Sequence, residues 1–180
     1  MRRRHLLAGL GSVGVLGGAG AVATGAVPGG FGSDGDEAAI EPTTIASIDA
    51  PGSRGGALSL PADGEPTFVD FFATWCDPCV EQMPALAEAN DRIGDRVTFV
   101  SVTTEDVGGS VTEAAVRDWW IENDGDWLVA ADVTAELAAK LGMNALPTAV
   151  ALDSGGRIRW SNSGVHTADE LVDGIETALD

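Results

Sequence analysis

Basic residues, cysteine and tyrosine are scarce in this chain of 180 residues. It contains no tyrosine, two histidines, two cysteines and one lysine, Lys140. Only 10 lysines and arginines stand against 28 aspartates and glutamates, so the formal net charge is −18. A surface this acidic repels nucleic acid and anionic lipid, and we therefore expect neither as a partner.

The shortage of soft ligands argues against a metal centre. Beyond the N-terminal segment the candidates are Cys76, Cys79 and His166, whereas a structural zinc site needs four ligands, usually two such pairs. Carboxylates could complete a set, but nothing in the sequence marks which ones. A purely structural disulfide is also disfavoured, because closing a two-residue loop removes little entropy from the unfolded chain.

A redox role explains more of the segment from Cys76 to Cys79. Pro78 suits the first position of a helix, where a missing N–H is tolerated. Cys76 then precedes the helix, at the positive end of the helix dipole, where a thiolate is stabilised. Cys79 lies one turn further in, and we expect an exposed nucleophilic thiol beside a sheltered resolving thiol, as thiol–disulfide exchange requires. The negative charge of Asp77 opposes this effect, and we expect the helix N–H groups to outweigh it.

Strand and helix patterns alternate along the rest of the chain. The patterns predict an α/β sandwich in which the run "TFVDFFAT" is a central strand covered on both faces. Strands are predicted over residues 57–61, 67–74, 97–104, 127–132, 147–153 and 157–163, and helices over 78–93, 112–123, 134–142 and 167–179.

The first 27 residues have the composition of an export signal or a membrane anchor. Arg3 and Arg4 precede an uncharged apolar run over residues 6–27, and the pair resembles a twin-arginine signal. Ala21-Val22-Ala23 offers a cleavage site, while the run is also long enough to span a membrane, so both outcomes stay open. Either outcome places the protein on the outer face of the membrane or outside the cell.

Residues 28–44 are rich in glycine and acid and predict a flexible linker, followed by one folded domain over residues 45–180. We expect membrane contact only through the N-terminal segment. The acidic, lysine-poor composition resembles that of proteins from salt-loving archaea, in which molar salt screens self-repulsion.

The segment "VDFFATWCDPC" resembles the active-site strand and turn of the thioredoxin superfamily. On this resemblance, Cys76 is the nucleophile, Cys79 the resolving cysteine and Asp70 a buried acid that relays a proton. Trp75 corresponds to the tryptophan before the first cysteine, and Pro84 to a proline that kinks the active-site helix.

A second segment extends the resemblance. Leu146-Pro147-Thr148 lies where the superfamily has its cis-proline loop, and Gly164 corresponds to a glycine near the substrate groove. The resemblance predicts that Pro147 is cis and lies against the cysteine pair. It also implies a substrate groove formed by Trp75, Asp77, Pro78, Leu146 and Gly164.

The chain is longer than a minimal thioredoxin, with 67 residues between Cys79 and Pro147. The extra strand and helix around residues 104–131 resemble the insertion of the TlpA/ResA-like branch of exported or membrane-tethered oxidoreductases. This resemblance implies a thioredoxin-like fold with a mixed central sheet and a thiol–disulfide oxidoreductase that needs no cofactor beyond its own disulfide. Its partners would be protein disulfides or dithiols and an upstream membrane electron donor or acceptor. A reductive role in cytochrome maturation is one such function.

Two residues depart from that branch or from thioredoxin. Gln82 stands where many branch members carry glutamate, and the pair between the cysteines is Asp-Pro, not Gly-Pro. A copper-delivery module of the SCO type, on the same fold, is the alternative function. That class has three residues between its cysteines and a histidine ligand, whereas this chain has two residues between and no well-placed histidine.

Three further predictions concern single side chains. Asp70 could be a plain structural residue, but burial of a carboxyl without a partner is costly, so we favour a raised pKa and the relay role. Trp119 and Trp120 are expected to pack in the core from the inserted helix. His166 is expected to be solvent-exposed and not catalytic.

Overall fold

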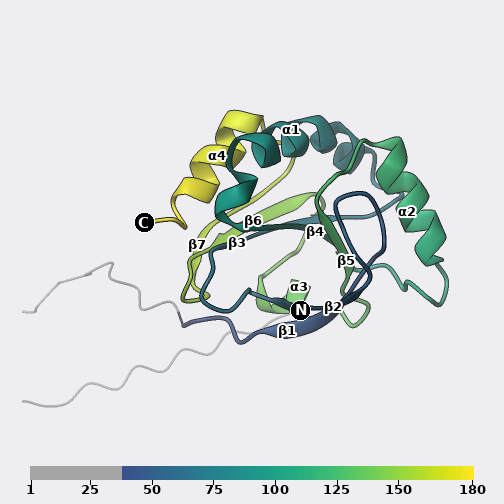
Figure 1. The fold of residues 1–180 in the computed structure, drawn as a ribbon, viewed down its shortest axis with the longest axis horizontal. Helices are drawn as coiled ribbons and strands as arrows, with labels where there is room; N and C mark the ends of the chain where they lie inside the picture. The colour runs from purple at the N-terminus through teal and green to yellow at the C-terminus, as the bar shows by residue number, and fades with distance from the viewer. Residues whose placement is uncertain (1–37) are drawn as a thin grey trace, which may run out of the picture. The chain divides into compact units, whose positions relative to one another are not determined.

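A mixed seven-stranded sheet with helices on both faces forms the framework of residues 38–180, the part that the computed structural model describes (Figure 1). The strands are β1 (Thr43–Ser47), β2 (Gly56–Leu60), β3 (Thr67–Phe72), β4 (Thr98–Thr103), β5 (Leu128–Ala131), β6 (Thr148–Leu152) and β7 (Ile158–Ser163). The helices are α1 (Asp77–Ile93), α2 (Glu113–Glu122), α3 (Glu136–Lys140) and α4 (Ala168–Glu176), with a 3₁₀ turn at Gly94–Arg96.

The strands lie in the order β2-β1-β5-β4-β3-β6-β7, which puts β3 well inside the sheet. β3 runs parallel to β4 and antiparallel to β6, and all six of its residues are buried. This is the central strand predicted from its continuous apolar run. The active-site turn therefore follows a fully buried strand inside the sheet.

Side chains that alternate along β3 divide the core into two layers. Phe68 and Phe72 point to the layer beneath α1, α2 and α4, and Val69 and Phe71 point to the layer beneath α3. Figure 1 shows the same division, with α1, α2 and α4 on one side of the sheet and α3 on the other. The predicted α/β fold class, a mixed sheet flanked by helices, is confirmed.

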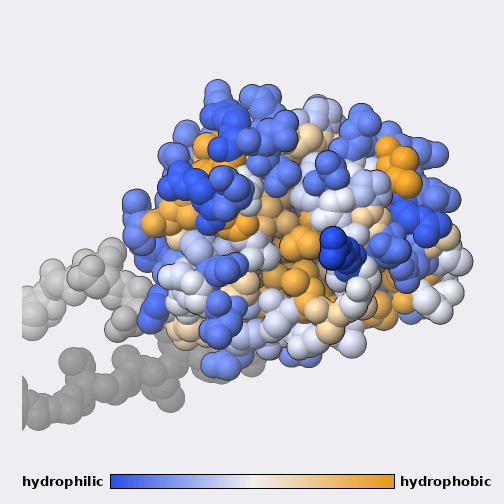
Figure 2. Space-filling model, in the orientation of Figure 1, coloured by the Kyte–Doolittle hydropathy of each residue, from blue (hydrophilic) through white to orange (hydrophobic). Residues whose placement is uncertain are grey.

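The aromatic residues of α2 fill the first layer. Trp119 stacks on Phe72 with ring centroids 4.8 Å apart, and Trp120 meets Trp127 edge-on at 4.8 Å. The prediction that both α2 tryptophans are core residues is confirmed. Hydrophilic side chains cover much of the outer surface over α1, α2 and α4 (Figure 2).

The observed elements differ from the predicted ones mainly at their ends and at β1. β1 was not predicted, and its first two residues fall in the segment expected to be a linker. It pairs with β2 on one side and β5 on the other, so tertiary pairing creates the strand from a short polar sequence. α3 is shorter than predicted, because Asp132 accepts from the N–H groups of Glu136 and Ala138 and so fixes where the helix begins.

The predicted export or anchor segment, residues 1–27, and most of the predicted linker lie outside the described residues. Among the helices of residues 38–180, none is long and apolar enough to cross a membrane.

Candidate active site at the N-terminus of α1

The two cysteines form a disulfide where the chain passes from β3 into α1. Their Cα atoms are 5.3 Å apart. Cys76 is the N-cap of α1 and Pro78 lies in the first turn, as predicted from the position of the proline. The backbone N–H of Cys79 donates to Sγ of Cys76 at 3.3 Å. The same N–H is placed to stabilise a thiolate on Cys76 after reduction.

Both sulfur-bearing residues are buried, which corrects the expectation of one exposed and one sheltered cysteine. Cys76 is 5% exposed and Cys79 is 2% exposed. What separates them is position, because Cys76 lines a groove at the surface and Cys79 does not. Access for a substrate therefore comes through the groove and not from general exposure.

That groove has a volume of about 590 Å³ and is built from two segments far apart in the sequence. One wall is the redox turn from Trp75 to Pro78, and the other is the segment from Met143 to Leu146 that leads into Pro147. The Leu146–Pro147 peptide bond is cis, as predicted from the resemblance. Trp75 is 72% exposed, so it is free to contact a partner at the groove.

Gly164 lies beside the cis-proline segment. Its N–H donates to the carbonyl oxygen of Pro147 at 2.9 Å, and its φ of 102° is a conformation that favours glycine. Gly164 is not among the residues that line the groove. It therefore belongs to the support behind the groove wall.

Gln82 connects the active-site helix to the loop that contains Gly164. It is 2% exposed, and its amide bonds to both the N–H and the carbonyl oxygen of His166. The expectation that His166 is solvent-exposed is wrong, since its side chain is only 11% exposed and packs edge-on against Trp160. No local pattern signals the contact between Gln82 and His166, which are 84 positions apart.

Asp70 lies in the middle of β3 and faces the same layer as the disulfide. The alternation along β3 places it with Phe68 and Phe72, in the layer that contains Cys76 and Cys79. It is 2% exposed. Burial raises the pKa of the Asp70 carboxyl to about 7, and a hydrogen bond from Ser101 opposes the rise. The prediction of a buried acid with a raised pKa is confirmed.

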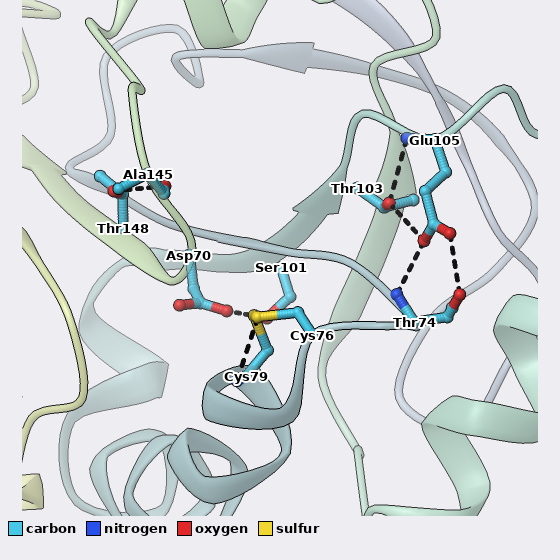
Figure 3. Close-up of a disulfide and its surroundings, with 9 residues drawn as sticks. All are labelled: Asp70, Thr74, Cys76, Cys79, Ser101, Thr103, Glu105, Ala145 and Thr148. Carbon is cyan, nitrogen blue, oxygen red and sulfur yellow. Dashed lines mark hydrogen bonds between the residues drawn. A yellow bond between two sulfur atoms is a disulfide. The ribbon is translucent and has the colours of Figure 1, made fainter.

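Two unpredicted side chains stand behind Asp70, since Ser101 bonds to Asp70 and Trp127 bonds to Ser101. Ser101, opposite Asp70 in the parallel register of β4, donates from Oγ to Oδ2 of Asp70 at 3.4 Å (Figure 3). Nε1 of Trp127 donates to the same Oγ at 2.9 Å. Ser101 is a buried polar residue in the middle of a largely apolar strand, and that interruption of the pattern was the available signal.

Glu105 is a second missed residue. Its carboxylate accepts from the N–H of Thr74 at 2.8 Å, from Oγ1 of Thr74 at 2.8 Å and from Oγ1 of Thr103 at 3.0 Å (Figure 3). Thr74 directly precedes Trp75, so Glu105 anchors the start of the redox turn to the end of β4.

Within residues 38–180, no group of three or more His, Cys, Asp or Glu side chains is placed to hold a metal ion.

The profile of the Redoxin family matches residues 44–179. The chain belongs to the Redoxin family. Together with the fold and the Cys76–Cys79 disulfide, this makes it a thioredoxin-like thiol–disulfide oxidoreductase of the TlpA/ResA-like kind. The exchange needs no cofactor, because the disulfide itself carries the two electrons.

This Redoxin-family chain is similar to sporulation thiol-disulfide oxidoreductase A of Bacillus subtilis, with 27% identity over 68% of this chain and 74% of the relative. The crystal structure of that protein, StoA, superposes with a TM-score of 0.62 and 25% identity, over 76% of this chain and 97% of StoA. The chain is also 27% identical to the thiol-disulfide oxidoreductase ResA of Bacillus thuringiensis, over 60% of each protein. An exposed lipoprotein thioredoxin of Streptococcus pneumoniae shares the fold, with a TM-score of 0.63 and 21% identity over 76% of this chain and 98% of the other.

Proposed function

We propose that this oxidoreductase acts outside the cytoplasm on protein disulfides, with Cys76 as the nucleophile and Cys79 as the resolving cysteine. The observation that carries the proposal is the groove beside Cys76. It is open at the surface, has a volume of about 590 Å³ and is edged by the exposed Trp75.

The proposed reaction runs in two balanced steps. The Cys76 thiolate attacks a substrate disulfide, whose S–S bond breaks, and one substrate sulfur leaves as a thiolate. The Cys79 thiol then attacks Cys76 in the mixed disulfide, releases the second substrate sulfur and forms the Cys76–Cys79 bond. Asp70 accepts the proton that Cys79 loses. The substrate gains two electrons and the enzyme is oxidised.

Two features support Cys76 as the attacking group. It is the cysteine that lines the groove, and it caps the helix where the N–H of Cys79 points to its sulfur. We place Leu146 and Pro147 opposite it as the wall against which a substrate strand lies. Asp77 and Pro78 complete the rim on the other side.

For the substrate class we propose the disulfide of an apocytochrome, in a reductive role in cytochrome maturation, with electrons supplied by a membrane donor. The distant similarity to the thiol-disulfide oxidoreductase ResA supports this choice. The N-terminal segment supports export by a twin-arginine-like route, to the outer face of the membrane or beyond it. The acidic composition supports a protein that functions at high salt concentration.

A redox titration of the purified full chain tests the proposal. The protein is equilibrated in thiol–disulfide buffers, its free thiols are alkylated and the species are counted by mass spectrometry. We expect a two-electron transition that C76S and C79S both abolish. The reduced protein should also reduce an oxidised peptide that carries Cys-x-x-Cys-His, the attachment motif of c-type haem. Failure to exchange disulfides with that peptide or with any protein disulfide would contradict the proposal.

The same sample tests the copper-delivery alternative. Reduced protein is titrated with Cu(I) in competition with a chromophoric chelator. Tight binding at one ion per chain, without disulfide exchange, would favour copper delivery. We expect exchange without tight copper binding, because the two thiols lack a third ligand among the described residues.

A further inference from the structure

We propose that Trp127 and Ser101 are positioning residues for the Asp70 relay, and that they direct the transferred proton to Oδ1 of Asp70. The proposal rests on the proposed role of Asp70 and goes beyond it, because it assigns the oxygen that acts and the two side chains that select it.

The indole N–H of Trp127 fixes the direction of the hydrogen bonds around Ser101. An indole Nε1–H donates and never accepts, so the 2.9 Å contact from Trp127 occupies an acceptor site on Oγ of Ser101. The hydroxyl of Ser101 has one proton to give. Its other side-chain partner is Oδ2 of Asp70, and the hydroxyl is therefore set to donate there.

The fixed orientation of the Ser101 hydroxyl makes the two carboxyl oxygens of Asp70 unequal. Oδ2 accepts from Ser101, so a proton on Oδ2 would face the Ser101 proton. Oδ1 is buried and has no hydrogen-bond partner in the described part of the chain. A proton that arrives from Cys79 is therefore accommodated at Oδ1, while Oδ2 keeps its bond to Ser101.

The surroundings leave few other groups to control Asp70. β6 presents Ala149 opposite it, and β4 presents Ser101. The thiols of Cys76 and Cys79 lie in the same layer once the disulfide is reduced. Burial and the Ser101 bond are the two influences on the pKa of Asp70. Removing the hydroxyl of Ser101 should thus change the pKa of Asp70 and with it the proton transfer from Cys79.

The test follows the resolving step alone. Reduced full-length protein reacts with Ellman's reagent, and the first release of thionitrobenzoate reports attack by Cys76. The second release reports attack by Cys79 on the mixed disulfide, in which the Cys79 proton passes to Asp70. The rate of this second phase is measured by stopped flow from pH 5 to pH 9 in wild type, S101A, W127F and D70N.

The rate of the second phase should rise with pH as Asp70 ionises. We expect S101A to move the midpoint of this rise to higher pH, because the Asp70 carboxylate loses the hydrogen-bond donor of Ser101. The second phase at pH 6 should slow about three- to tenfold. W127F frees the hydroxyl to rotate and accept from the protonated carboxyl, so the midpoint should shift in the same direction. In the S101A background W127F should add nothing, and in the D70N background S101A should change nothing.

W120F is the matched control. Trp120 is also buried, packs against Trp127 and donates its Nε1–H, but to the carbonyl oxygen of Pro51. Its replacement should leave the pH profile unchanged. An equal shift in W120F would mean that lost packing, and not the lost donor to Ser101, causes the effect.

The outcomes separate this proposal from the proposed function. If wild type shows no second phase, or D70N matches wild type, the relay role of Asp70 fails. If D70N alters the profile while S101A superimposes on wild type, the present inference is overturned and the relay stands. If the shifts in midpoint caused by S101A and W127F add up in the double variant, Trp127 does not act through Ser101 and its assigned role is overturned. If W127F does not fold, S101A still tests the proposal, because it removes only one oxygen atom.

Discussion

The side-chain amide of Gln82 holds both backbone polar groups of His166. Its Oε1 accepts from the N–H at 2.6 Å, and its Nε2 donates to the carbonyl oxygen at 3.1 Å. The loop so held includes Gly164, which bonds to Pro147. A neutral amide thus links the active-site helix to the support of the cis-proline segment.

Replacing this amide by an acid should loosen the connection. In Q82E the introduced carboxylate cannot donate to the carbonyl oxygen of His166 and faces it at short range. We expect the free energy of unfolding to fall by about 1–3 kcal/mol at neutral pH. Urea titration of the oxidised protein measures it. The loss should shrink at acid pH, where the introduced carboxyl is protonated and can donate.

E81Q is the control for this change, because Glu81 is the exposed neighbour of Gln82 on the same helix. Its stability should stay close to that of wild type. If Q82E is as stable as E81Q at neutral pH, the double contact to His166 contributes nothing measurable.

Replacing Glu105 should weaken the anchor of the redox turn. The carboxylate receives three donors from Thr74 and Thr103, whereas the amide in E105Q offers one acceptor oxygen and adds two donors. We expect a loss of about 1–2 kcal/mol in unfolding free energy and slower attack by Cys76. The first phase with Ellman's reagent measures the attack. E122Q, at an exposed site on α2, should change neither quantity.

The ionisation of Asp70 should make the oxidised protein less stable as the pH rises. Its pKa is raised from 3.8 to about 7, so the folded state binds the proton more tightly than the unfolded state. Between these values the folded state holds more protons, and the free energy of unfolding falls with rising pH. The fall is complete above about pH 7 and amounts to at most about 4 kcal/mol, at 1.36 kcal/mol per pKa unit.

D70N carries no titrating carboxyl and should lack this component. Urea unfolding at pH 4, 6 and 8 should show D70N gaining stability relative to wild type as the pH rises. D173N, which changes an exposed carboxyl, should follow wild type. A constant difference between D70N and wild type would mean that Asp70 titrates normally.

Trapping should establish the order of attack. C79S leaves Cys76 without a resolving thiol, so mixed disulfides with partners should accumulate on non-reducing gels. C76S should trap none, because Cys79 does not line the groove. Mass spectrometry of trapped bands identifies the partners. The reverse pattern would make Cys79 the nucleophile.

Salt should stabilise the folded chain. The net charge of −18 implies self-repulsion in the compact state, and the screening length shortens from about 10 Å at 0.1 M salt to about 3 Å at 1 M. We expect a higher melting temperature in 2 M than in 0.1 M KCl. Sucrose serves as the uncharged control, and equal gains in sucrose and KCl would exclude charge screening as the cause.

The sequence alone determined the elements whose cause is local. The apolar run of β3 and the start of the last helix near Thr167 each depend on neighbours within a few positions, and both formed as predicted. The Thr167–Glu170 capping box is the local cause at α4. The position of Cys76 at the start of a helix followed from Pro78 in the same way. Hydrophobic periodicity and helix capping are properties of short segments, so a single sequence contains them.

Only the tertiary structure decided which polar groups meet. Ser101 reaches Asp70, Gln82 reaches His166 and Glu105 reaches Thr74 across separations of 31, 84 and 31 residues. The register of β3 against β4 and the path of the loop before α4 create these contacts. The burial of His166 and Cys76 has the same origin, because exposure depends on what folds over a residue. Long-range packing, and not local preference, thus fixed the groove, the acid and the supports of the redox turn.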